Sequence, residues 1–183
     1  MADLRLYNPA TRFYLASPLA FADWQNPTAA ELNANPTNDP NGLIWELTCA
    51  LDQADTTFDL GDSEVDDSLS FCQVAGASTP ITYSPEISYT IFRSKDRWEI
   101  SDPTSFNTAN LAFSLLAWRG IEYFAIASVG EEPGVDFAVG QRVKMARVAT
   151  DFITDVAETG GNVRATASFL RRGDVNWNFE IQA

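Results

Sequence analysis

The stretch that decides the fold class is residues 163–182, which read VRATASFLRRGDVNWNFEIQ. Its second half alternates four apolar residues with four polar ones: Val175, Trp177, Phe179 and Ile181 against Asn176, Asn178, Glu180 and Gln182. Period-two alternation is typical of a β-strand with one apolar face and one wet face. We expect two strands, 163–170 and 175–181, joined by a turn at Gly173-Asp174 that also accounts for the adhesion-like Arg-Gly-Asp tripeptide.

Further strands precede this stretch. Residues 121–129 are apolar on both faces, and residues 141–156 form a long mixed segment that is followed by Gly160-Gly161. Short turns would join these strands and the C-terminal ones into an antiparallel meander. Nearer the N-terminus, apolar residues recur at period two over residues 43–51, and a further short strand is expected at residues 87–91. The sequence therefore predicts a mainly β protein.

One helix is expected, at about residues 103–119. Asp102 stands at the N-cap position, Pro103 at the first helical position and Gly120 just past the end. Leu111, Leu115 and Trp118 would form the apolar face that packs on the sheet.

Two segments are expected to lack regular structure. Residues 1–41 contain five prolines, a density that excludes a long helix or a central strand. Aromatic residues in this N-terminal arm indicate that it docks on its own domain or on a neighbour. Residues 54–84 predict a long acidic loop, and loops of this length in compact domains are usually contact elements or disordered.

The charge of the chain is unevenly distributed. Its 183 residues include 25 acidic and 12 basic side chains, a formal net charge of −13, and no histidine. Between Phe13 and Phe92 there are twelve carboxylates and no Lys or Arg. The missing imidazole excludes Ser/His/Asp triads, Cys/His pairs and zinc sites with histidine ligands. Because a chain this acidic repels nucleic acid, any role with DNA would work through repulsion.

The length fits a single domain, residues 1–183, and no apolar run reaches the ~20 residues of a membrane helix. No secretory signal is visible, so we expect a cytoplasmic product. In that compartment buried thiols are favoured for Cys49 and Cys72, although the sequence also allows one disulfide.

Catalytic and ligand-binding motifs are not apparent. The acidic residues 59–67 lack the calcium-loop pattern, and a glycosidase pair of carboxylates cannot be recognised from sequence alone. Neither GxGxxG nor GxxxxGK is present. We expect no catalytic, cofactor or metal residues and no enzymatic activity.

From Leu115 onward the chain resembles the major tail (tail tube) protein of bacteriophages with long, non-contractile tails. Three blocks carry the resemblance: Trp118-Arg119-Gly120-Ile121-Glu122-Tyr123-Phe124, Phe137-Ala138-Val139-Gly140-Gln141-Arg142-Val143 and, above all, Arg171-Arg172-Gly173-Asp174-Val175-Asn176-Trp177-Asn178. The resemblance implies two packed antiparallel sheets flanked by one α-helix, and six subunits per ring. It also implies rings stacked into a tube whose inner sheets join around a lumen.

The same resemblance implies a virion protein of the tail that assembles in the host cytoplasm, without a cofactor. Its partners would be further copies of itself, the tape measure protein and the tail terminator and distal tail proteins. DNA would pass through the lumen without tight binding, and no membrane would be involved.

Candidate functional residues follow from the charge pattern. The acids expected to line the lumen are Glu46, Asp52, Asp151 and Asp155. Basic groups of one subunit would meet acidic groups of its neighbour: Arg93, Lys95, Arg97, Arg171 and Arg172 against Asp59, Asp62, Glu64, Asp66 and Asp67. The arm and the acidic loop would connect successive rings.

A second hypothesis also fits these observations. In it, the chain is a monomeric β-sandwich that binds a protein or carbohydrate partner through its tryptophans and its acidic loop.

Overall fold

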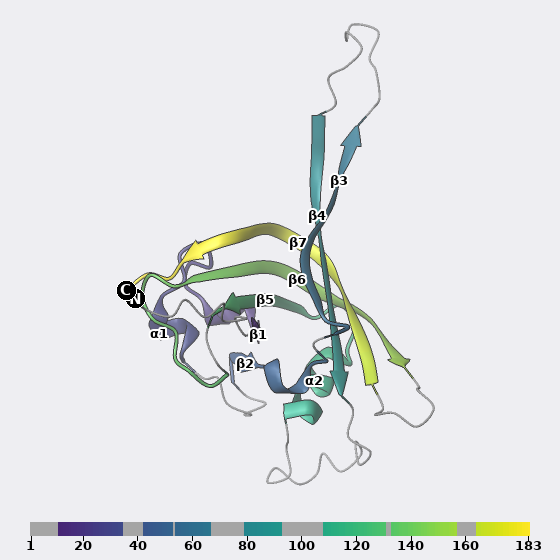
Figure 1. Cartoon of the computed structure of the whole chain (residues 1–183), viewed down its shortest axis with the longest axis horizontal. Helices are drawn as coiled ribbons and strands as arrows, with labels where there is room; N and C mark the ends of the chain where they lie inside the picture. The colour runs from purple at the N-terminus through teal and green to yellow at the C-terminus, as the bar shows by residue number, and fades with distance from the viewer. Residues whose placement is uncertain are drawn as a thin grey trace, which may run out of the picture.

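Among the residues that the structure describes, seven strands form one open antiparallel sheet in the order β2-β1-β5-β6-β7-β4-β3 (Figure 1). The structure is a computed structural model, and it describes residues 11–34, 42–52, 54–66, 79–92, 108–130, 133–156 and 164–183. The strands are β1 Thr11–Ala16, β2 Ile44–Glu46, β3 Thr57–Asp66, β4 Thr79–Phe92, β5 Glu122–Val129, β6 Arg142–Val156 and β7 Arg164–Glu180. The helices are α1 Ala29–Leu32 and α2 Thr108–Leu116, and the 3₁₀ turns are η1 Pro18–Ala20 and η2 Thr48–Ala50.

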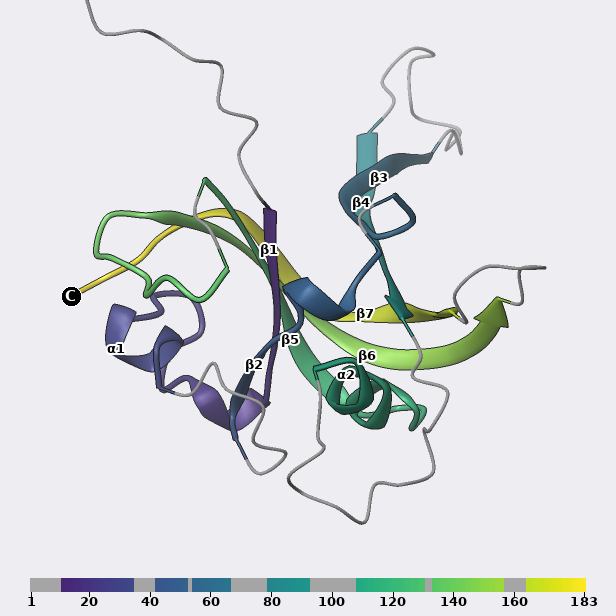
Figure 2. The ribbon, with the colours of Figure 1, turned by 60° about the horizontal axis from the view of Figure 1, so that its bottom comes forward.

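The expected pair of packed sheets is wrong, because a single sheet buries both of its faces. Alternate residues of the central strands enter two separate cores. Leu15, Tyr123 and Val148 pack on the face that α2 covers. Tyr14 and Phe124 pack on the opposite face, beneath η1 and α1. Figure 2 shows the two helices over different parts of the sheet. Because helices and loops cover both faces, no second sheet is needed.

The described part of the N-terminal arm docks on its own domain, as one of the two alternatives predicted. The expectation that prolines exclude a central strand is wrong, since β1 lies between β2 and β5. Prolines mark the ends of elements here instead: Pro18 begins η1 after its cap, Ser17. The short helix α1 begins at a capping box, in which the Glu31 amide donates to Thr28 Oγ1 at 3.2 Å and the Thr28 amide donates to Glu31 Oε2 at 2.9 Å.

The segment expected as a long acidic loop is largely a β-hairpin. Strands β3 and β4 pair from Thr57 opposite Ser88 to Asp66 opposite Thr79. The strand expected over residues 43–51 is shorter than predicted, because the chain leaves the sheet after Glu46 and turns through η2. Cys49 therefore lies exposed as a free thiol rather than buried. Cys72 lies outside the described residues.

Strand β7 runs through the expected turn at Gly173-Asp174 without reversing. Val148 pairs with Arg171 and Ala146 pairs with Val175, so Arg147 alone lies opposite the three intervening residues. This β-bulge is one of three register shifts along the β6–β7 ladder. The expected single wet face is also wrong, because Val175 packs in the core beside α2 whereas Phe179 packs in the opposite core.

Helix α2 is the predicted helix, with a shorter C-terminal end. Leu111, Ala112 and Leu116 are buried, as the apolar periodicity requires. Trp118, expected on the packing face, lies beyond the helix and is 72% exposed. Asp102 and Pro103 lie outside the described residues.

The backbone conformations of two glycines give a matched test of this fold. Gly120 has φ of +83°, where an added Cβ is strained, whereas Gly173 lies in extended strand and a Cβ there would sit 3.5 Å from the Arg147 side chain, an ordinary contact. Gly120→Ala should lower the free energy of unfolding by about 1 kcal/mol, measured by urea titration. Gly173→Ala should change the free energy of unfolding by less than about 0.5 kcal/mol. A large loss of stability in this variant would contradict the extended strand at Gly173 and favour the turn predicted from the sequence.

Candidate assembly surfaces

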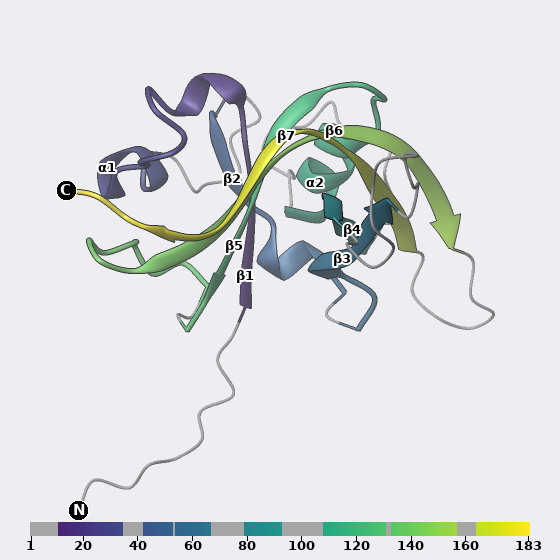
Figure 3. The same cartoon turned by 90° about the horizontal axis from the view of Figure 1, so that it is seen from above.

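The two longest strands are each paired along only part of one edge. Strands β6 and β7 run side by side across the molecule (Figure 3). However, β5 pairs with β6 only over Val143–Ala149, and β4 pairs with β7 only over Arg164–Ser168. In the described part of the chain, no strand lies beside β6 after Thr150 on the edge that β5 occupies before it. Likewise, no strand in the described ranges lies beside β7 after Ser168 on the edge that β4 occupies before it. Such edges present backbone donors and acceptors that can pair with another strand.

The hairpin of β3 and β4 stands away from the rest of the sheet (Figures 1 and 2). Its charged residues are all acidic: Asp59, Asp62, Glu64, Asp66 and Glu86. Asp59 lies directly opposite Glu86, and like charges in this arrangement weaken strand pairing. The hairpin therefore carries a concentrated negative charge.

An arginine on β7 fixes the base of this hairpin. Arg164 forms ion pairs with Asp52 and, at 2.7 Å, with Asp55. The Ala54 amide, which donates to Asp52 at 3.0 Å, and the Arg164 guanidinium together lower the pKa of the Asp52 carboxyl. On the neighbouring strand, the Thr90 hydroxyl donates to the Asp55 carbonyl at 3.0 Å. The hairpin thus leaves the sheet from a fixed base.

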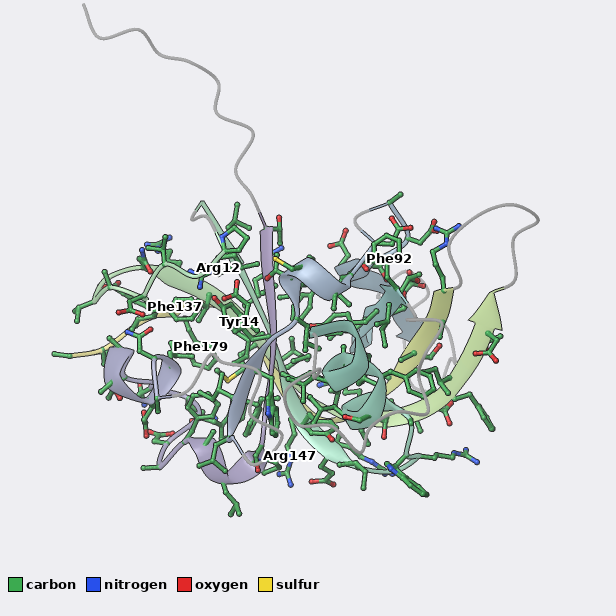
Figure 4. The ribbon with its side chains drawn as sticks, turned by 90° about the horizontal axis from the view of Figure 1, so that it is seen from below. Arg12, Tyr14, Phe92, Phe137, Arg147 and Phe179 are labelled. Atoms are coloured by element: carbon green, nitrogen blue, oxygen red, sulfur yellow. The ribbon has the colours of Figure 1, made fainter. Side chains whose placement is uncertain are left out.

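A second arginine, Arg12 on β1, is buried. Its guanidinium pairs with Glu46 at 3.2 Å and donates to the Val135 carbonyl at 2.6 Å. It lies 5.0 Å from the ring centroids of both Tyr14 and Phe137 (Figure 4). Burial, and then the charge of Glu46, raise the pKa of Tyr14 well above its usual range, so its phenol stays neutral. Arg12 therefore joins β1, β2 and the loop before β6.

Most of the candidate lumen acids are neutralised within the subunit. Three of them form ion pairs with arginines: Glu46 with Arg12, Asp52 with Arg164, and Asp151 with Arg119 at 2.9 Å. Glu46 also accepts hydrogen bonds from the Thr48 hydroxyl and the Gly134 amide, and its side chain is 11% exposed. Asp155 is exposed on the outer part of β6.

The candidate contact residues are divided among three positions. Arg171 and Arg172 are exposed on β7, where Arg171 donates to the Gly173 carbonyl at 2.7 Å. Asp59 is exposed on β3, the strand that also contains Asp62, Glu64 and Asp66. Arg93, Lys95, Arg97 and Asp67 lie outside the described residues.

Sequence reasoning missed the ion pairs of Arg12, Arg119 and Arg164 and the exposed aromatic residues Trp118 and Phe152. One signal for Arg12 was available, since it is the last basic residue before the acid-only stretch and is followed by Phe13 and Tyr14. An arginine that is buried beside an aromatic residue needs an acid as partner.

Sites for other ligands are not found in the ranges described. No group of three or more metal-binding side chains occurs among the residues searched. Likewise, none of the helices seen there has the length and apolar character needed to span a membrane.

Comparison with protein families matches residues 1–182 to the phage tail tube protein family. The chain belongs to that family. Comparison with curated protein sequences gave no match. A phage tail tube protein is a structural, non-enzymatic component of the virion tail, and the resemblance noted from residues 115–183 is confirmed over the whole chain. In a tail tube protein, the ion pairs described above are structural, and the open strand edges are the functional candidates.

The buried ion pair of this tail tube protein predicts a specific pattern of stability. Arg12→Met should lower the free energy of unfolding by about 3 kcal/mol, because Glu46 is left with a mostly buried, uncompensated charge. Adding Glu46→Gln should recover part of the loss by removing that charge. Urea titration of the wild type and both variants measures these values. If Arg12→Met alone is as stable as the wild type, the role of Arg12 is contradicted.

Proposed function

We propose that this tail tube protein assembles into rings of six subunits that stack into the tube through which phage DNA passes. The observation that supports it most directly is the staggered sheet, which leaves one edge of β6 and one edge of β7 available. The two edges lie on opposite sides of the shared β6–β7 ladder. Pairing β6 of one copy with β7 of the next is a heterologous contact, and such contacts close into rings or extend into helices.

The N-terminal arm and the segment 54–84 would connect successive rings. The hairpin within that segment extends beyond the sheet and offers an acidic surface to another copy (Figure 1). Exposed Arg171 and Arg172 are suitable basic partners, together with Arg93, Lys95 and Arg97. Exposed pairs would set register more than affinity, since each contributes about 0–1 kcal/mol. The tape measure, tail terminator and distal tail proteins would contact the completed tube.

The wall of the lumen would repel DNA. Duplex DNA carries one negative charge per ~1.7 Å, and basic groups on a wall would retain it through counterion release. Of the four proposed lumen acids, Asp155 has the exposed side chain, whereas Glu46, Asp52 and Asp151 are partly buried, so Asp155 is the most informative position to test.

Electron microscopy of the purified chain tests the assembly. Rings or tubes are expected for the wild type, whereas the monomeric binding module of the second hypothesis would give isolated 20.1 kDa particles. Proline introduced singly at Asn176, Trp177 and Asn178 removes one backbone donor in each case. If a variant stays folded by circular dichroism, the lost donor is one on the open edge and not one bonded to β6. Such a variant should not assemble. A folded variant that forms normal tubes would exclude β7 edge pairing.

The charge of the lumen is tested in whole phage. Asp155→Lys should slow DNA ejection, because the new cations attract phosphates, and raised salt should reduce the effect. Asp155→Asn, the matched neutral change, should have a smaller effect. If tails with lysine at this position have normal length and eject DNA at the wild-type rate, Asp155 does not line the lumen.

A further inference from the structure

Four large apolar side chains remain exposed near the C-terminal end of β6. Trp118 and Ile121 lie in the turn between α2 and β5, and this turn is joined to β6 because the Ile121 amide donates to Thr150 Oγ1 at 3.1 Å. Phe152 follows on β6 and is 60% exposed, and Leu170 lies on β7 opposite Ala149. With Arg119, these residues form what we call the Trp118 patch.

Arg119 gives the patch a fixed cationic group. Its guanidinium lies 4.4 Å from the centroid of the Phe152 ring and 2.9 Å from Asp151. A cation held over an aromatic face is partly desolvated and oriented before a partner arrives. Exposed aromatic and arginine side chains together are the residues that most often dominate protein interfaces. Arg171 and Arg172, both exposed, follow Leu170 directly.

We propose that the Trp118 patch binds the β3–β4 hairpin of a second copy of this chain. The inference rests on the proposed function, because it requires self-assembly. The hairpin contains five acidic residues and no basic one, and it therefore matches in charge the exposed Arg171 and Arg172 that follow Leu170 of the patch.

The patch and the hairpin lie at opposite edges of this part of the sheet. In the part of the sheet that contains the patch, the strand order is β6-β7-β4-β3, so β6 with the patch and β3 of the hairpin form opposite edges. A contact between these edges is heterologous, and each copy would use its hairpin on one neighbour and its patch on another. The patch also adjoins the β6 edge that the proposed function pairs with a neighbour's β7. Since β4 separates from β7 beside the open β7 edge, at Ser88 and Ser168, the base of this neighbour's hairpin would lie beside the patch, and its outer part would remain available to the next ring.

Photo-cross-linking in the full-length chain tests the contact directly. A photoreactive phenylalanine analogue at position 152 should give cross-linked peptides from residues 57–92. Mixed light and heavy isotope labelling should show that these peptides come from another copy. The same analogue at Val139, which is 59% exposed and precedes the other end of β6, is the matched control and should not capture the hairpin. Cross-links from position 152 that never include residues 57–92 would overturn the proposal.

Assembly thresholds give a second measurement. Phe152→Ser and Trp118→Ser should each raise the concentration needed for assembly about tenfold, whereas Val139→Ser should change it less than about twofold. All three side chains are exposed, so the melting temperatures should be unchanged. If the wild type assembles and the patch variants assemble like the Val139 control, this inference fails and the proposed function stands. A wild type that stays monomeric at all concentrations overturns both.

Discussion

The antiparallel ladder between β6 and β7 is the element on which the rest of the sheet depends. It runs from Arg142 opposite Glu180 to Val156 opposite Arg164. The other strands join it directly, as β5 and β4 do, or through these two strands. β5, β1 and β2 continue the sheet from one half, while β4 and β3 continue it from the other. Because the two sets are attached at opposite ends and on opposite sides, the described residues leave part of one β6 edge and part of one β7 edge unpaired, besides the edges of the terminal strands β2 and β3. A structural protein of a tube requires such edges, because a closed sheet has no backbone left to share.

The distribution of charge follows the same division. Arginines of the body bind carboxylates of the same chain: Arg12 binds Glu46, Arg119 binds Asp151, Arg147 binds Glu122 and Arg164 binds Asp52. The hairpin has no basic residue with which to form such pairs. The two hairpin strands contribute five negative charges and no positive one to the formal net charge of −13. Like charges keep the hairpins of separate copies apart until a basic surface is available.

Local patterns in the sequence predicted the elements that depend on local chemistry. Strand β6 and the fully buried β5 followed from length and periodicity, and the end of α2 was marked within a few residues by Gly120. The continuity of β7 could not be predicted, because Gly173-Asp174 has the composition of a turn. The bulge is recognised only from the strand pairing, in which Arg147 of β6 lies opposite three residues of β7. Strand β1 was missed because Pro18 marks the start of the next element and does not exclude a strand before it. The Arg12–Glu46 pair spans 34 positions, and no spacing rule connects residues so far apart.

The three register shifts along β6 and β7 have a geometric consequence. Each bulge adds twist and bends the strand that contains it, so the curvature of this sheet is set at fixed places along the chain. In a closed ring, every copy turns the path by an equal share of a full circle. In the proposed ring, the bends along this ladder would therefore contribute to the width of the bore. Insertion or deletion of a single residue at a bulge would alter this curvature and the joints together, because all three shifts lie in the β6 and β7 segments proposed to pair between copies.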